Sequence, residues 1–157
     1  MYLATIFINL VVFTILSVFD IKHRIAPNYI TIPYMLFGIG ILFIDHTRIQ
    51  YLLNTLEVSV ILVILFIYSR LRGKNLTDMF GGGDVKVLIG FSLMSDFYTF
   101  NLSLITGTLI GIIWAKVNSK NSIPFIPFLS SGYVIALVVD FVIKQVRFGW
   151  YQVSSLL

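Results

Sequence analysis

The 157-residue chain contains no cysteine, and only 11% of its residues carry a formal charge. The absence of cysteine excludes disulfides, a cysteine nucleophile and cysteine-ligated metal sites. A soluble domain of this length has about a quarter of its residues charged, so this chain could not cover its surface in water. The two histidines, His23 and His46, fall on opposite sides of the predicted topology. We therefore expect no metal and no other cofactor.

The chain also lacks a Pro/Ser/Gly-rich linker, an internal repeat and a low-complexity tract. These absences favour one membrane-embedded domain over residues 1–157. Its apolar stretches do not alternate with period two, which excludes the pattern of barrel strands. The predicted fold is an all-α, polytopic membrane bundle. The first apolar stretch has no basic segment before it and no small-residue cleavage site after it, so we expect it to stay in the mature protein.

About six transmembrane helices are predicted, over residues 2–19, 29–44, 52–69, 85–100, 101–115 and 123–143. Two of these stretches are weaker than the rest. The second is short and contains Pro33. The fourth is uninterrupted only from Val85 to Met94, and an apolar run of about ten residues fits a re-entrant or broken helix.

Basic residues predict the orientation. Eight of the eleven lie on one side of the predicted bundle, and three lie on the other. The positive-inside rule makes the first side cytoplasmic and both termini extracytoplasmic. The positive charge is thus a topology signal, and without an aromatic and basic pattern we expect no nucleic-acid partner. The first side carries Lys22, Arg24, Arg70, Arg72, Lys74, Lys86, Lys116 and Lys120; the other carries Arg48, Lys144 and Arg147.

Five of the seven acidic residues have ordinary explanations. Asp45 and Asp96 fall in or near short external loops, and Asp78 falls in a basic loop as a surface charge. Glu57 and Asp140 fall inside predicted helices, where an ionisable group should face the bundle interior. For these two, structural pairing is favoured over a functional role.

Asp20 and Asp84 differ from the others because both lie at the cytoplasmic boundary of a predicted helix. Two neighbouring carboxylates share a proton, so one can activate water while the other supports a carbonyl oxygen. On position alone, helix capping or pairing with nearby Lys or Arg explains them equally well.

Three glycines, Gly81, Gly82 and Gly83, immediately precede Asp84. Glycine permits positive φ and close backbone approach, by a substrate strand or by another helix. A glycine turn before a capping aspartate explains one glycine more easily than three. No G-x-x-x-x-G-K-[ST] run is present, which argues against a phosphate loop.

Three segments resemble those of prepilin peptidases, the type IV aspartic peptidases of membranes. Gly81 to Leu88 (GGGDVKVL) is similar to the family's G-x-G-D-x-K-L/V segment, with Gly82 at the variable position. Asp20 to Thr31 (DIKHRIAPNYIT) is similar to its first-aspartate segment, with Ala26 before Pro27 and Ile30 in place of leucine as mild departures. Ile123 to Leu129 (IPFIPFL) is similar to the P-F-x-P-F-L opening of its last helix.

The resemblance implies that Asp20 and Asp84 are the catalytic pair of an aspartic endopeptidase. It would remove the short basic leader from prepilin-like (type IV or Flp pilin, or archaellin) precursors at the cytoplasmic face of the cell membrane, without a metal. Larger members also methylate the new N-terminus through a region with paired cysteines. Methylation is not expected here, because that region and all cysteines are missing.

Three further residues belong to the candidate site, and one glycine pair indicates helix packing. Lys86 would hold the charged state of the pair or shape its loop, or would simply snorkel to the interface. Pro27 and Asn28 are expected to shape the turn after the first helix. Gly107, with Gly111, forms a small-xxx-small pair that usually means close helix packing.

Three other readings stay open at this point. A presenilin-like peptidase also has G-x-G-D, but Phe19 precedes Asp20 and no Pro-Ala-Leu occurs. A small ion-transport subunit would use acids spread through the membrane depth. A catalytically inactive subunit of a pilus or secretion assembly is the third.

Overall fold

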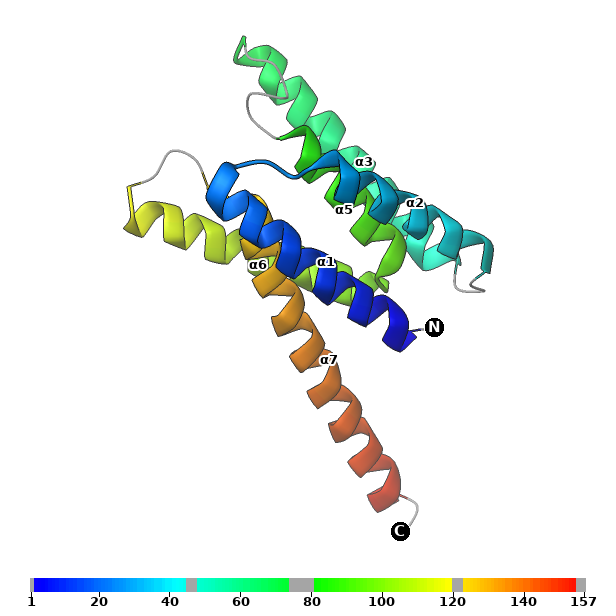
Figure 1. Ribbon diagram of the computed structural model, residues 1–157. Helices are drawn as coiled ribbons and strands as arrows, with labels where there is room; N and C mark the ends of the chain where they lie inside the picture. Colours follow the sequence, from blue (N-terminus) through cyan, green and yellow to red (C-terminus); the bar gives the residue numbers. More distant parts are fainter. Residues whose placement is uncertain (1, 45–47, 74–80, 120–122, 155–157) are drawn as a thin grey trace.

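The computed structural model describes residues 2–44, 48–73, 81–119 and 123–154, and these ranges are helical apart from short connections. Six helices lie in them, which confirms the predicted all-α fold (Figure 1). They are α1 (Tyr2–His23), α2 (Asn28–Ile44), α3 (Arg48–Leu71), α5 (Gly82–Met94), α6 (Phe97–Val117) and α7 (Phe125–Ser154).

Four of these helices are long and apolar enough to cross a membrane, namely α1, α3, α6 and α7. The other two are shorter, with 17 residues in α2 and 13 in α5. At 1.5 Å per residue α5 rises only about 20 Å, against about 30 Å for a hydrocarbon core. Length and composition therefore support four of the six predicted crossings, and the fourth predicted helix is the shortest, as its sequence indicated.

The predicted boundary between the fourth and fifth helices, at residues 100 and 101, is wrong. Helix α5 ends at Met94, and α6 begins at Phe97. The cause is Asp96, whose carboxylate accepts the main-chain N–H of Thr99 at 2.9 Å and so caps the start of α6. The last helix also differs from the prediction, because α7 continues to Ser154 rather than ending at residue 143.

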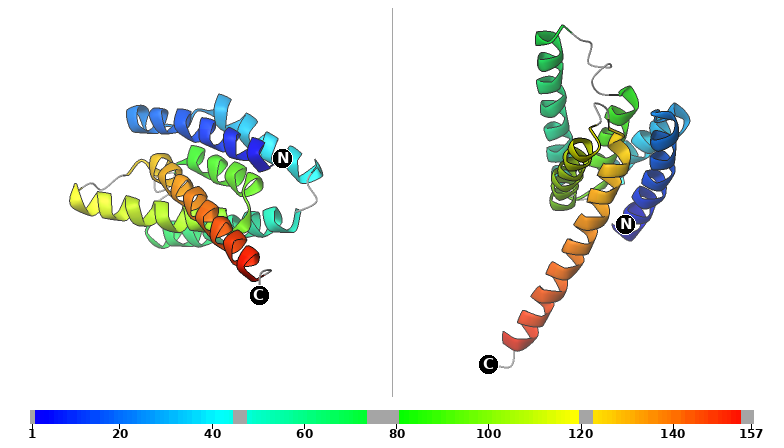
Figure 2. Two further views of the ribbon diagram at one scale, coloured as in Figure 1. Left: turned by 90° about the horizontal axis from the view of Figure 1, so that it is seen from below. Right: turned by 90° about the vertical axis from the view of Figure 1, so that its left-hand side faces the viewer.

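The helices pack mainly as neighbours along their length. Helix α6 lies along α7, α2 lies along α5, and α1 and α3 contact α7 and α5 respectively. The ends of α1, α3 and α6 and the starts of α2, α5 and α7 lie toward the same side, at the upper left of Figure 1. Helix α7 extends well beyond the other helices (Figure 2). Because successive helices run in opposite directions, segments that are distant in sequence meet at one end of the bundle.

Helix α5 is the enclosed element of the bundle. Its Val87, Leu88, Phe91, Leu93 and Met94 side chains are all buried, whereas each of the other five helices exposes several large apolar side chains. A helix too short to span can be accommodated at membrane depth when protein surrounds it. The enclosure of α5 explains why the bundle can contain so short an element.

An aromatic cluster fixes α5 against three other helices. The Phe91 ring lies 5.0 Å from Phe13 of α1, 5.3 Å from Phe100 of α6 and 5.2 Å from Tyr133 of α7, centroid to centroid. Edge and offset contacts of this kind stabilise a core beyond the area that they bury. Because four helices meet there, the cluster helps to set the relative positions of α1, α5, α6 and α7.

A buried hydrogen-bond network lies beside this cluster. The Asn9 side-chain oxygen accepts from the Tyr34 hydroxyl at 2.7 Å, and its amide lies 3.4 Å from Ser95 Oγ and Tyr133 Oη. Asn54 donates to the carbonyls of Ser92 and Ser95 at 3.2 and 2.8 Å, at the end of α5. Buried polar groups need such partners, so these bonds help to position α1, α2, α3 and α7 around the end of α5.

Candidate active site

Asp20 lies in the last turn of α1 and is almost fully buried, with 6% of its surface exposed. Its Oδ2 accepts the main-chain N–H of Ile126 at 3.1 Å. Ile126 is the second residue of α7, so the bond joins the end of α1 to the start of the last helix. This contact places the first aspartate where two distant helices meet.

Asp84 lies in the first turn of α5, outside the four candidate spans. The pKa of its carboxyl is raised to about 6, chiefly by burial and then by the neighbouring Asp20 carboxylate. A hydrogen bond from the main-chain N–H of Gly81 acts in the opposite direction. Asp20 therefore lies near enough to Asp84 to influence its pKa, and the catalytic role of the two residues stays a prediction.

The three glycines before Asp84 have different surroundings. A Cβ on Gly83 would lie 2.5 Å from the Ala26 Cβ and 2.9 Å from the Ala26 carbonyl oxygen. A Cβ on Gly81 would lie 2.9 Å from Asp84 Oδ2, whereas one on Gly82 would meet nothing within 4 Å. Gly83 thus allows the segment after α1 to approach α5, and Gly82 faces open space.

A second contact joins the same two segments. The Lys86 ammonium donates to Asn28 Oδ1 at 2.6 Å. The neighbouring Pro27 carbonyl accepts the N–H groups of Ile30 and Thr31, both at 3.1 Å, where α2 begins. The Lys86–Asn28 bond therefore joins the start of α2 to α5, two residues along the chain from Asp84.

Such an arrangement can perform acid–base chemistry on a peptide bond. A buried carboxyl with a pKa near 6 keeps its proton at mildly acidic pH and can donate it to a carbonyl oxygen. The neighbouring Asp20 carboxyl is held by the Ile126 N–H, and in its charged form it can receive a proton from water. No group of three or more potential metal ligands occurs among the described residues.

The remaining acidic residues lie elsewhere. Asp140 forms an ion pair with Lys144 at 2.6 Å, four residues along α7, as the structural reading predicted. Glu57 is half-buried on α3, and Asp96 caps α6. Asp45, Asp78 and His46 lie outside the described residues.

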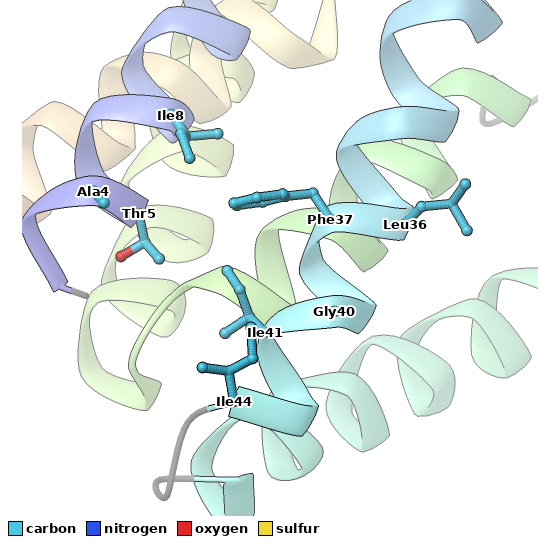
Figure 3. Close-up of a pocket in the computed structure, with 8 residues that line it drawn as sticks. All are labelled: Ala4, Thr5, Ile8, Leu36, Phe37, Gly40, Ile41 and Ile44. Carbon is cyan, nitrogen blue, oxygen red and sulfur yellow. The ribbon is translucent and has the colours of Figure 1, made fainter.

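A separate apolar groove of about 550 Å³ opens between α1 and α2 (Figure 3). It lies toward the start of α1, and Ile8 on its wall precedes Asp20 by about 18 Å along the helix. The groove is therefore distinct from the carboxyl pair. Its lining residues are Ala4, Thr5, Ile8, Leu36, Phe37, Gly40, Ile41 and Ile44.

Sequence reasoning missed the bond between Ile126 and Asp20. The only signal was the Ile123–Leu129 segment, which marked the start of the last helix without indicating what its N–H groups bind. The Asn9 and Asn54 networks were also missed, because isolated asparagines in apolar stretches give no clue to their partners.

The fold and the site together define a multi-pass helical membrane protein with a carboxyl pair at one end of its bundle. The sequence model of the type IV leader peptidase family matches residues 7–116, which include both aspartates. The chain belongs to this family, and the family indicates a peptidase. Comparison with curated proteins and with solved structures gave no match.

Proposed function

We propose that this protein is an aspartic endopeptidase that removes the short basic leader from prepilin-like precursors, with Asp20 and Asp84 as its catalytic pair. The observation that supports it best is the influence of the Asp20 carboxylate on the pKa of Asp84, although the two residues are 64 positions apart in sequence (84 minus 20). Membership of the type IV leader peptidase family favours this class of substrate.

The two carboxyl groups divide the work of hydrolysis. The Asp20 carboxylate takes a proton from water as the water oxygen attacks the scissile carbonyl carbon, and Asp84 gives its proton to the carbonyl oxygen. A neutral tetrahedral diol results. Asp20 then passes its new proton to the leaving nitrogen while Asp84 recovers one from the diol, the C–N bond breaks, and both groups return to their first state.

The two parts of a prepilin-like precursor suit the two environments on either side of the proposed site, the cytoplasm and the bilayer. A prepilin-like precursor has a basic leader followed by an apolar helix, so the helix would lie in the bilayer beside the enzyme. Basic residues at the carboxyl-pair end of the bundle, among them Arg24, Arg70 and Lys116, favour a cytoplasmic location for that end. We therefore place the site at the cytoplasmic face of the cell membrane and both termini outside, in a single domain over residues 1–157.

Cleavage of a co-expressed prepilin-like precursor tests the proposal. Asp20→Asn and Asp84→Asn should each lower cleavage by roughly 10²–10⁴-fold, the usual contribution of an acid or base. Asp140→Asn is the matched control, because its carboxylate pairs with Lys144 away from the site. Membrane levels of each variant are measured alongside.

Each result has a distinct meaning. Cleavage that persists in either variant would remove that aspartate from the mechanism. No cleavage by wild type across several leader types would count against the peptidase and favour an inactive subunit of a pilus assembly. Equal loss of cleavage in Asp140→Asn would mean that the effect of the other two substitutions is not specific to the carboxyl pair.

A further inference from the structure

We infer that the start of α7 is part of the active site, in which the main-chain N–H of Ile126 positions the Asp20 carboxylate and favours its charged form. This inference rests on the proposed function and adds a positioning group to it. The start of α7 lies beyond residues 7–116, the part of the chain that the family match covers.

The first observation is the hydrogen bond itself. The Ile126 N–H lies 3.1 Å from Asp20 Oδ2, across 106 residues of sequence, and both residues are buried. The N–H groups in the first turn of a helix have no partner within the helix. They also carry the positive end of its dipole, so a carboxylate bound there is stabilised in its charged form.

The local sequence leaves Ile126 well suited to this role. Pro127, the next residue, has no N–H to offer, and Pro124 precedes the helix. Proline is tolerated in a first turn, so these residues allow the helix to start while removing a competing donor. The Ile126 side chain is fully buried, which holds its N–H in a fixed direction.

The packing of α6 fixes the start of α7. A Cβ on Gly107 of α6 would lie 2.7 Å from the Phe128 carbonyl oxygen and 3.0 Å from the Leu129 Cα. A Cβ on Gly132 of α7 would overlap the Ser103 carbonyl oxygen of α6. The two backbones are therefore in direct contact just after Ile126, so α7 cannot shift without separating from α6.

The groups around Asp20 differ in how they affect its negative charge. From α5 the Asp84 carboxyl faces Asp20 and opposes a second negative charge. Arg24, just after the end of α1, carries a positive charge four residues along the chain from Asp20. From α7 the Ile126 N–H is the contributor, because no charged residue precedes Asp140 on that helix. The Ile126 bond therefore helps to keep the shared proton on Asp84.

A pair of substitutions separates the N–H from the side chain. Ile126→Ala removes the side chain and keeps the N–H, whereas Ile126→Pro removes both and still fits a first turn. We expect kcat for precursor cleavage to be about 10- to 100-fold lower in Ile126→Pro than in Ile126→Ala, since hydrogen bonds to charged groups have effects of that size. KM should be equal in the two variants, and the acid limb of the pH–rate profile should move to higher pH in Ile126→Pro.

A second variant removes the N–H alone. Ile126 is replaced by its α-hydroxy acid in cell-free synthesis into liposomes, with the same replacement at Val134 in the middle of α7 as control. The Ile126 ester should show the lower kcat and the shifted profile, and the Val134 ester should show neither.

Equal kcat and equal pH profiles for Ile126→Pro and Ile126→Ala would overturn the inference, as would an Ile126 ester that behaves like the Val134 ester. If Ile126→Pro does not insert into membranes, the comparison of the Ile126 ester with the Val134 ester tests the inference instead. A different result would contradict the proposed function itself, namely that the wild type cleaves no precursor.

Discussion

At the scale of single residues, Asp84 combines burial with a negative neighbour. Its carboxyl has a pKa of about 6 in place of the usual 3.8, chiefly because of burial and then because of Asp20. A carboxyl whose pKa is raised on folding stabilises the folded state at low pH. That stabilisation is lost as the pH rises from about 4 through about 6.

This difference predicts a pH-dependent stability. Between pH 4 and 7 the melting temperature of the wild type in detergent should fall relative to Asp84→Asn, which has no carboxyl to ionise. In Asp20→Asn one cause of the raised pKa is removed, so the fall should be smaller and should end at lower pH. Thermal unfolding over a pH series measures all three proteins. The same pH dependence in wild type and Asp84→Asn would contradict the assignment.

Two adjacent glycines provide another residue-scale prediction. Gly83→Ala should destabilise the protein by roughly 1–3 kcal/mol, because the new methyl would overlap Ala26. Gly82→Ala should have no such cost, because nothing lies within 4 Å of its Cβ position. Melting temperatures of the two variants compare them directly. Equal destabilisation would mean that backbone freedom, rather than the approach of Ala26, requires the glycines.

At the scale of helices, the contact between α2 and α5 depends on small residues. A Cβ on Gly38 of α2 would lie 2.9 Å from the Leu93 Cβ and 3.1 Å from the Gly90 carbonyl oxygen. A Cβ on Gly90 would lie 2.5 Å from the Tyr34 ring. Because Asn28 at the start of α2 contacts Lys86 of α5, this packing also affects the candidate site.

The matched pair on α2 is Gly38→Ala and Gly40→Ala. Gly38→Ala should lower stability, since the clash outweighs the gain in helix propensity. Gly40→Ala should be neutral or stabilising by up to about 1 kcal/mol, because its Cβ meets nothing within 4 Å. Thermal unfolding at one pH gives both values, and a stable Gly38→Ala would show that α2 can move away from α5 without cost.

At the scale of the whole molecule, the prediction concerns orientation. The chain has no cysteine, so a single introduced thiol can be labelled without background. Ile49 and Leu71 are exposed at opposite ends of α3, one of the four candidate spans. With the carboxyl-pair end in the cytoplasm, a membrane-impermeant maleimide added outside should label Ile49→Cys. It should label Leu71→Cys only after permeabilisation, and the reverse pattern would place the candidate site outside the cell.

From the sequence alone we could predict that the chain lies in a membrane, that it is helical, and that Asp20 and Asp84 are the candidate pair. These follow from local properties: few charges, long apolar stretches without alternation, and glycines beside Asp84. The family match agrees with the resemblance that the Asp20 and Asp84 segments carried. The catalytic role of the pair stays a prediction, for which the cleavage assay is the test.

The tertiary structure decided what lies between distant segments. Only packing shows that α5 is enclosed, that Gly83 contacts Ala26 while Gly82 does not, and that the Ile126 N–H reaches Asp20. Helical patterns report neighbours three or four residues away, whereas the bond to Asp20 joins residues 106 apart. Apolar residues on a membrane helix face lipid or protein with similar ease, so the sequence does not specify which helix faces which.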